Sequence, residues 1–290
     1  MNCMEIVSAG SSSSGNSYII IAGDQTIILD VGLPAKKIKA ALGHLGCGPE
    51  DVGAVLITHE HIDHVKSVRA ISRCCVNAGF YASRGTVFSA QNFCHVPEER
   101  IHLMSSGDSA VLESCADEDG GVVIRSFSLS HDAAEPLGFS IEAGGEKLAV
   151  VTDSGIISEE IFEAVRDADQ LVFEANHDED MLMFGEYPYH VKVRIKSDMG
   201  HLSNVYAGDV LARILEYRKS GLGVRPPGHP GRKPLRIMLA HLSFHNNIPL
   251  FAKQTVEERL GERGFVKGRD YLLDVAAKEG LTFMPGDRDA

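Results

Sequence analysis

Hydrophobic residues recur along this chain in short runs and in longer periodic stretches. Short apolar or β-branched runs bounded by turn-forming residues predict buried strands, whereas apolar residues that return every three or four positions predict amphipathic helices. The runs predict strands at Met4–Val7, Tyr18–Ile21, Thr26–Leu29, Ala54–Thr58, Val122–Leu129, Leu148–Thr152, Gln170–Glu174 and Leu235–Ala240. The periodic stretches predict helices at Pro34–Leu45, Val65–Cys74, Ser158–Val165, Asn204–Tyr217 and Ile248–Leu260. Strands interleaved with helices in both halves of the chain predict an α/β protein.

Turn and cap residues support these boundaries. Residues Ala22–Gln25 predict a hairpin turn, Pro34 suits the first turn of a helix, and Ser158 is a candidate N-cap. Residues 221–233 are rich in glycine and proline but lie between a predicted helix and a predicted strand. We therefore expect a surface insertion there and a single domain over residues 1–290.

Composition narrows the class of protein. The chain has 290 residues, of which 44% are hydrophobic, which is ample for a core. No apolar run approaches the roughly 18 residues of a membrane span, and we expect no secretory signal and no membrane partner. The six cysteines show no CxxC spacing, which is typical of reduced thiols in a cytoplasmic protein. The net charge of −12 opposes loose attraction to nucleic acid without excluding an enzyme that acts on it.

The stretch after the Ala54–Thr58 strand is the most informative in the chain. His59, His61, Asp63 and His64 follow one another within six positions. Neutral imidazole and carboxylate are ligands of zinc, manganese and iron, and different subsets of these four side chains can face two ions. A polar loop that carries several histidines by chance is the simpler alternative.

A strand followed by His-x-His-x-Asp-His resembles the metallo-β-lactamase superfamily. The resemblance requires further ligands at later strand ends, and His131, Asp153 and His241 occur there in the expected order. It implies that His59, His61 and His131 hold one ion, that Asp63, His64 and His241 hold a second, and that Asp153 bridges them. It also implies an αββα sandwich, in which two mixed sheets pack face to face with helices outside and the metal motifs lie along one edge.

Two later residues separate branches of this superfamily. In its phosphodiesterase branch, an acidic residue at a strand end pairs with a histidine of a His-x-Ser/Thr motif, and Glu174 and His201 match those positions. β-Lactamases lack this pair, so the match favours phosphodiester chemistry. The alternatives are that Glu174 caps a helix and that His201 only starts one.

Almost the whole chain resembles the bacterial YycJ-type group of this superfamily, which is described as DNA exonucleases. The resemblance rests on the motifs at residues 11–17, 58–64, 152–156, 174–178, 200–204 and 240–247. The glycine- and proline-rich stretch at 221–233 departs from the group and leaves that side of a substrate groove in doubt.

Together these residues predict a dinuclear-metal phosphodiesterase. Two divalent ions per chain, zinc or manganese, suit hydrolysis by a metal-bridging hydroxide. Asp63 can bind metal and orient or deprotonate the water, and His201, kept cationic by Glu174, can protonate the leaving oxygen. The ligand types do not distinguish zinc from manganese.

Candidate substrate contacts lie outside the metal motifs. The serine-rich loop, residues 11–17, offers Ser13, Ser14 and Asn16 for binding a terminal phosphate. A flexible surface turn is equally consistent with its composition. Lys192 and Arg194 would form a cationic stripe on a strand but would spread on a helix. Asn204, in the His201 motif, completes the set.

Of the functions considered, we favour that of a DNA exonuclease, with nucleic acid as substrate. The alternative is a small-molecule or cyclic-nucleotide phosphodiesterase of the same superfamily. A di-iron oxidoreductase is disfavoured because such relatives usually carry Glu at the position of His61, and we expect no flavin or nucleotide cofactor. The direction of cleavage and the oligomeric state stay open.

Overall fold

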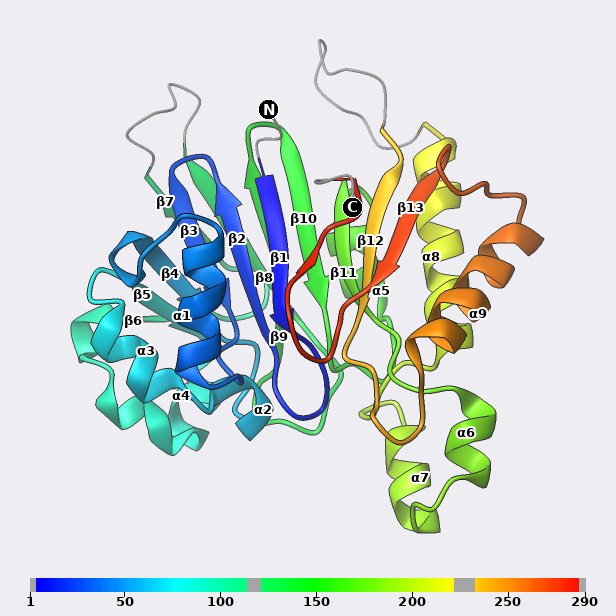
Figure 1. Cartoon of the computed structure of the whole chain (residues 1–290), viewed down its shortest axis with the longest axis horizontal. Coiled ribbons are helices and arrows are strands. Elements are labelled where there is room, and N and C mark those ends of the chain that lie inside the picture. Colours follow the sequence, from blue (N-terminus) through cyan, green and yellow to red (C-terminus); the bar gives the residue numbers. More distant parts are fainter. Residues whose placement is uncertain (1–3, 114–120, 222–232, 287–290) are drawn as a thin grey trace. The chain divides into compact units, whose positions relative to one another are not determined.

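The computed structural model describes residues 4–113, 121–221 and 233–286, and its strands form two mixed sheets of seven strands each (Figure 1). The chain divides into two compact units. Unit 1 comprises Met1–Ser128, Ala133–Gly144 and Ala277–Phe283, and unit 2 comprises Leu129–Asp132, Gly145–Ala276 and Met284–Ala290. The single domain stays a prediction. Most of the expected insertion at 221–233 lies outside the described residues.

Unit 1 contains one complete mixed sheet and a further antiparallel ladder. The sheet has the order β14-β1-β2-β3-β4-β5-β6, and β3 to β6 run parallel. Its strands are β1 (Met4–Gly10), β2 (Ser17–Ala22), β3 (Gln25–Leu29), β4 (Val52–Leu56), β5 (Gly79–Ala82), β6 (Ile101–Leu103) and β14 (Thr282–Phe283). The antiparallel ladder consists of β7 (Ser109–Leu112), β8 (Val122–Ser128) and β9 (Leu137–Ala143).

Helices of unit 1 bury their apolar faces on this sheet. The α-helices are α1 (Ala35–His44), α2 (Ile62–Val65), α3 (Val68–Cys74) and α4 (Arg84–Ser89). Ile38 of α1 and Ile71 of α3 share one buried cluster with Ile28 of β3 and Val55 of β4. This burial supplies the main stabilisation of the unit and fixes the strand ends from which the site residues project.

Unit 2 is built on parallel strands. They are β10 (Glu146–Val151), β11 (Gln170–Glu174), β12 (Leu235–Ala240) and β13 (Tyr271–Val275), paired in chain order. All residues of β11 are buried, as expected for a central parallel strand. The helices are α5 (Glu159–Val165), α6 (Glu179–Phe184), α7 (Tyr189–Ile195), α8 (Asn204–Lys219) and α9 (Pro249–Glu262), with α8 and α9 side by side (Figure 1).

Most of the predicted strands and helices are present, with informative differences. Ser158 caps α5 as predicted, because its side chain accepts a hydrogen bond from the Ile161 N–H. Pro34 is the N-cap of α1 and not its first helical residue. The single helix predicted at Val65–Cys74 is broken at Ser67, whose N–H donates to the Val31 carbonyl and whose hydroxyl donates to the Leu33 carbonyl. These contacts with a distant loop outweigh the local helical pattern.

Several elements were not predicted individually, namely α4, α6, α7, β5, β6, β7, β9, β13 and β14. None is longer than seven residues, and sequence patterns are weak over so few residues. None of the helices in the described part of the chain is long and apolar enough to span a bilayer.

Candidate metal and catalytic site

In unit 1, the segment after β4 and the first turn of α2 bring the four side chains of the histidine-rich motif together. The ring centroids of His59 and His61 are 4.6 Å apart, and those of His59 and His64 are 4.1 Å apart. Asp63 Oδ2 lies 3.5 Å from His64 Nε2. His59 and His64 are buried, whereas the side chain of Asp63 keeps 18% exposure. We call His59, His61, Asp63 and His64 the unit 1 cluster.

A buried carboxylate that the sequence analysis missed orients this cluster. Asp30 follows β3, the parallel neighbour of β4, so its side chain lies next to the end of β4. Its Oδ2 is 2.7 Å from His64 Nδ1, and its Oδ1 accepts from the Thr58 N–H at 2.9 Å. The Thr58 hydroxyl donates to Asp30, so its oxygen can accept from His59 Nδ1 at 3.0 Å. The signal for Asp30 was an acidic residue directly after an apolar strand.

The serine-rich loop lies against the same motif. The Asn16 N–H donates to the Asp63 carbonyl at 2.8 Å, and Asn16 Nδ2 lies 3.2 Å from His64 Nε2. A Cβ on Gly32 would fall 1.5 Å from the Asp63 carbonyl oxygen, so only glycine permits this approach. The loop therefore neighbours the unit 1 cluster, and substrate contacts by Ser13, Ser14 and Asn16 stay predictions.

Unit 2 gathers a second group of metal-type ligands. Asp153, Glu174, His201 and His241 each offer one ligand atom, and these atoms all lie within 4.8 Å of one another. Asp153, Glu174 and His241 come together because β10, β11 and β12 are parallel neighbours, so residues at the carboxyl ends of these strands meet at one edge. His201 reaches them from the segment between α7 and α8. His131 adjoins them, with its Nε2 3.8 Å from Asp153 Oδ1. We call these five residues the unit 2 cluster.

Glu174 holds two histidines at once. Its Oε1 is 2.8 Å from His201 Nδ1 and 3.0 Å from His241 Nδ1, and its Oε2 accepts from the Ser154 N–H. Burial alone would raise the pKa of Glu174, but the charge of His201 and the hydrogen bonds from both histidines hold that pKa below its ordinary value. Glu174 is therefore an anion that contacts His201, as the resemblance implied, and also His241.

Three residues in or beside the two clusters have a strained backbone. Among the described residues, those other than glycine with positive φ are Asp30, Asp153 and His241, at 59°, 59° and 55°. Each lies within two residues of a strand end. Such backbone costs on the order of 1–3 kcal/mol per residue and persists where the surroundings enforce it, often at functional sites.

Four proposed ligands, His59, His64, His131 and His241, are arranged as metal-binding histidines usually are. Their Nδ1 atoms are engaged by Thr58 for His59, Asp30 for His64, the Gly200 carbonyl for His131 and Glu174 for His241. Engaging Nδ1 fixes the tautomer and leaves Nε2 as the ligand atom. Burial lowers the pKa of His131, which favours its neutral, metal-binding form. The donor sets therefore fit divalent metal ions.

The other predicted substrate residues have protein partners. Lys192 lies on helix α7 and donates to the carbonyls of Met183 and Gly185, so no strand-like cationic stripe forms. Arg194 Nε donates to Asp132 at 2.6 Å. Asn204 is buried and exchanges hydrogen bonds with the Asn247 amide. Contacts between these residues and a substrate stay predictions.

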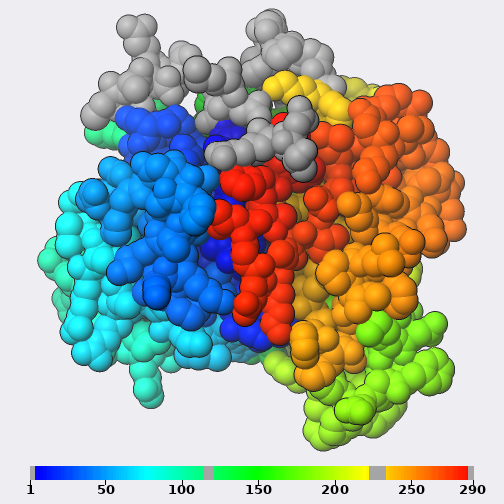
Figure 2. Space-filling view, in the orientation of Figure 1, coloured from blue at the N-terminus to red at the C-terminus, as the bar shows by residue number. Residues whose placement is uncertain are grey.

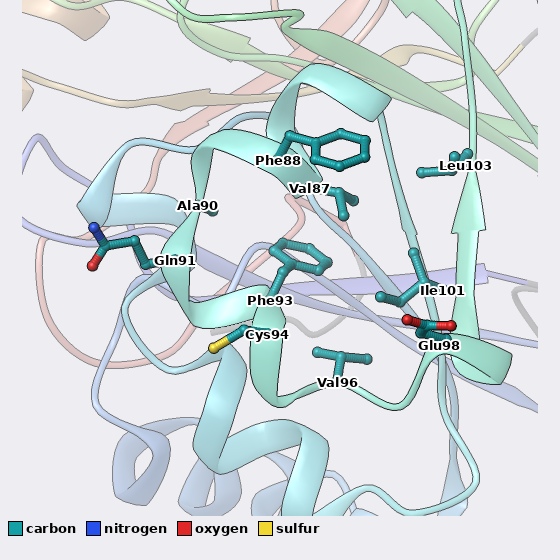
Figure 3. A pocket seen from close by; sticks show the side chains of 10 residues that line it. All are labelled: Val87, Phe88, Ala90, Gln91, Phe93, Cys94, Val96, Glu98, Ile101 and Leu103. Carbon is teal, nitrogen blue, oxygen red and sulfur yellow. The ribbon is translucent and has the colours of Figure 1, made fainter.

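A pocket of about 510 Å³ in unit 1 is separate from this chemistry (Figure 3). Its lining is mainly apolar, with the rings of Phe88 and Phe93 and the side chains of Ile101 and Leu103 around it. No residue of either cluster lines it. We therefore do not assign it to the candidate site.

Comparison with known proteins extends these observations. Residues 34–220 match a family model described as the β-lactamase superfamily domain. The chain is 31% identical over 264 residues to "Exodeoxyribonuclease YycJ" of Bacillus anthracis, which covers 91% of each chain. It is 32% identical over 266 residues to "Exodeoxyribonuclease WalJ" of Streptococcus pneumoniae, which covers 91% of this chain and 90% of the relative.

Solved structures show the same fold. The metallo-β-lactamase fold protein YhfI of Bacillus subtilis superposes with a TM-score of 0.65 at 15% identity, over 97% of this chain and 99% of that one. Zn²⁺-bound PqqB of Methylobacterium extorquens superposes with a TM-score of 0.62 at 16% identity, over 96% of this chain and 99% of that one. These likenesses confirm the predicted fold class.

Proposed function

The chain belongs to the metallo-β-lactamase superfamily, and on that premise we propose that it is a metal-dependent exonuclease that hydrolyses the phosphodiester bonds of DNA. Relatives named exodeoxyribonucleases match over most of both chains. The observation that carries the proposal is the position of Glu174, which holds His201 Nδ1 at 2.8 Å beside the ligand-type residues His241 and Asp153. A histidine held this way can serve a leaving oxygen through Nε2.

The metal ligands in this proposal are the seven that the resemblance to the superfamily implies. His59, His61 and His131 would hold one divalent ion, Asp63, His64 and His241 a second, and Asp153 both, with zinc and manganese as the candidates. When bound, two such ions offset charge that grows on the phosphate oxygens and make a water molecule more acidic.

The side chains of the protein supply the proton transfers. The Asp63 carboxylate is accessible enough to orient a water molecule and accept its proton. His201 gives the proton on Nε2 to the leaving oxygen, and the buried Glu174 anion stabilises the imidazolium before that transfer. Asp30 and Thr58 keep His64 and His59 in position through their Nδ1 atoms. The protein acts on DNA without a flavin or nucleotide cofactor, and we place it in the cytoplasm.

The test is hydrolysis of a panel of substrates by protein purified without chelator and loaded with Mn²⁺ or Zn²⁺. End-labelled DNA should release mononucleotides, whereas RNA and cyclic nucleotides should react more slowly. Asp63→Asn, which is nearly isosteric, should lose roughly 10² or more in turnover. Asp167→Asn, at an exposed carboxylate paired with Lys147, is the matched control and should keep full activity.

Two outcomes would replace this proposal. Hydrolysis of cyclic nucleotides without cleavage of DNA would favour a small-molecule phosphodiesterase. Normal turnover and normal metal content in Asp63→Asn would remove that residue from the mechanism.

A further inference from the structure

Three ring side chains of unit 2 form a row at the protein surface. Tyr187 lies between α6 and α7, and Phe244 and His245 lie in the turn after β12. The ring centroids of Tyr187 and His245 are 5.6 Å apart, and those of Phe244 and His245 are 5.1 Å apart. The Phe244 side chain is 64% exposed, His245 is exposed and Tyr187 is half-buried. We call these three residues the aromatic row.

The aromatic row is continuous with the unit 2 cluster. His241 begins the turn that carries Phe244 and His245. The Ser243 N–H donates to the Asn176 carbonyl at 2.7 Å, and the Asp178 N–H donates to the Asn246 carbonyl at 2.9 Å. These bonds fix the turn on the segment between β11 and α6, so the rings are presented from a rigid support. In Figures 1 and 2 the chain after β12, in orange, runs beside α6 and α7, in light green.

Two further exposed rings lie near Tyr187 in the sequence. Phe184, three residues before it, is 87% exposed, and Tyr189, two residues after it, is 76% exposed. Exposing large apolar side chains to water is unfavourable, and a group of them surrounded by polar residues is typical of a binding surface. Phe244 and His245 follow the proposed metal ligand His241 by only three and four residues, so a substrate bound at that ligand lies within reach of their rings.

Charge identifies which part of that substrate they contact. The chain carries a net charge of −12, which opposes general electrostatic attraction of a polyanion. Two cations of α7 are already engaged, Lys192 by backbone carbonyls and Arg194 by Asp132. Aromatic rings bind bases through their faces, independently of charge, and only unpaired bases expose those faces.

The Phe244 and His245 rings meet edge to face, at 83°, and leave the Phe244 ring exposed. We propose that the Phe244 ring of the aromatic row stacks on an unpaired base next to the bond that is cut, so that the preferred substrate is a single-stranded DNA end. This inference rests on the proposed function and names the form of the strand. Stacking would also give an acidic protein a contact with nucleic acid that does not depend on charge.

The test measures binding separately from hydrolysis. Binding of a short fluorescein-labelled strand with cleavage-resistant phosphorothioate linkages is followed by anisotropy on metal-loaded protein. Phe244→Ala should weaken binding about tenfold, and Phe244→Trp should restore it. Turnover of bis-p-nitrophenyl phosphate, which has no base, should be unchanged in both variants. The matched control is Phe88→Ala, since Phe88 is also exposed, at 75%, but lies at the pocket of Figure 3.

A second experiment uses a strand that lacks one base, an abasic strand. Removing the stacked base should weaken binding to the wild type about tenfold and should not weaken binding to Phe244→Ala further. Equal binding by Phe244→Ala and wild type, an equal loss in Phe88→Ala, or an equal loss on a blunt duplex would overturn the inference. If the wild type cleaves no DNA, the proposed function fails, and the same titration still decides whether the aromatic row binds bases.

Discussion

At the scale of single residues, buried carboxylates set the orientation of the histidines. Glu174 engages Nδ1 of His201 and His241, and Asp30 engages Nδ1 of His64. Each carboxylate stabilises one tautomer and points Nε2 away from itself. In both clusters a buried carboxylate therefore orients a histidine. Only Glu174 orients both a proposed metal ligand, His241, and a proposed proton donor, His201.

Replacing His201 separates a proton donor from a phosphate-binding residue. His201→Ala should strongly slow cleavage of DNA, whose alkoxide leaving group needs a proton, and should barely slow bis-p-nitrophenyl phosphate, whose phenolate leaves without one. Turnover on the two substrates and metal content decide the matter. Equal losses would assign His201 to phosphate binding, and loss of metal would make it a ligand.

His177 makes stability depend on pH. Burial lowers the pKa of this histidine from 6.5 to about 4 in the folded protein. Between these values the unfolded chain binds a proton that the folded protein does not, so stability falls as pH falls from about 6.5 to about 4. At pH 5 the loss should be about 2 kcal/mol relative to pH 7.5.

Urea unfolding at the two pH values measures this effect. His177→Gln should lack the pH-dependent term, whereas His95→Gln, at an exposed position, should keep it. Any contribution of metal release to both proteins cancels in the difference between them. A His177→Gln variant with the pH dependence of the wild type would show that another group is responsible.

At the scale of elements, the ends of strands and helices carry the function. Asp30, Asp153 and His241 adopt left-handed backbone next to the ends of β3, β10 and β12, which turns their side chains toward the clusters. The break at Ser67 similarly limits α2 to the turn that carries Asp63 and His64. Interior positions of the same elements are buried and apolar, and they hold these ends in place.

The cap of α5 offers a simple test of how firmly such ends are held. Ser158→Ala removes the acceptor for the Ile161 N–H and should lower the free energy of unfolding by about 1 kcal/mol. Ser158→Asp keeps an acceptor and should stay near the wild type. Urea midpoints of the three proteins check this, and equal losses in both variants would mean that the hydroxyl does not act as a cap.

At the scale of the whole molecule, metal is expected to stabilise the fold as well as support catalysis. Ligands that bind only the folded state add stability, by about 4 kcal/mol at a thousandfold excess over Kd. Chelation should therefore abolish hydrolysis and lower Tm, and Mn²⁺ or Zn²⁺ should restore both. Calorimetry and elemental analysis measure this, with two ions per chain expected.

The double variant His59→Ala, His61→Ala is the control for that experiment. It should hold one ion fewer and show a smaller change in Tm on chelation. Full hydrolysis by the chelated wild type would contradict a role for metal.

The sequence by itself determined what depends on neighbouring residues. Three kinds of feature could be predicted: the His59–His64 motif, the strands before Asp153 and His241, and the Ser158 cap. Each depends on a pattern of residue types that spans only a few positions. The pairing of Glu174 with His201 came from a resemblance to known proteins and not from spacing.

Only the tertiary structure decided which distant residues meet. Asp30 reaches His64 across 34 positions, and Glu174 reaches His241 across 67. Tyr187 meets His245 because the turn after β12 is bound to the segment that leads into α6. Such contacts depend on which strands become parallel neighbours and on where buried polar groups find partners. These outcomes are settled by packing of the whole core, and no local pattern in the chain encodes them.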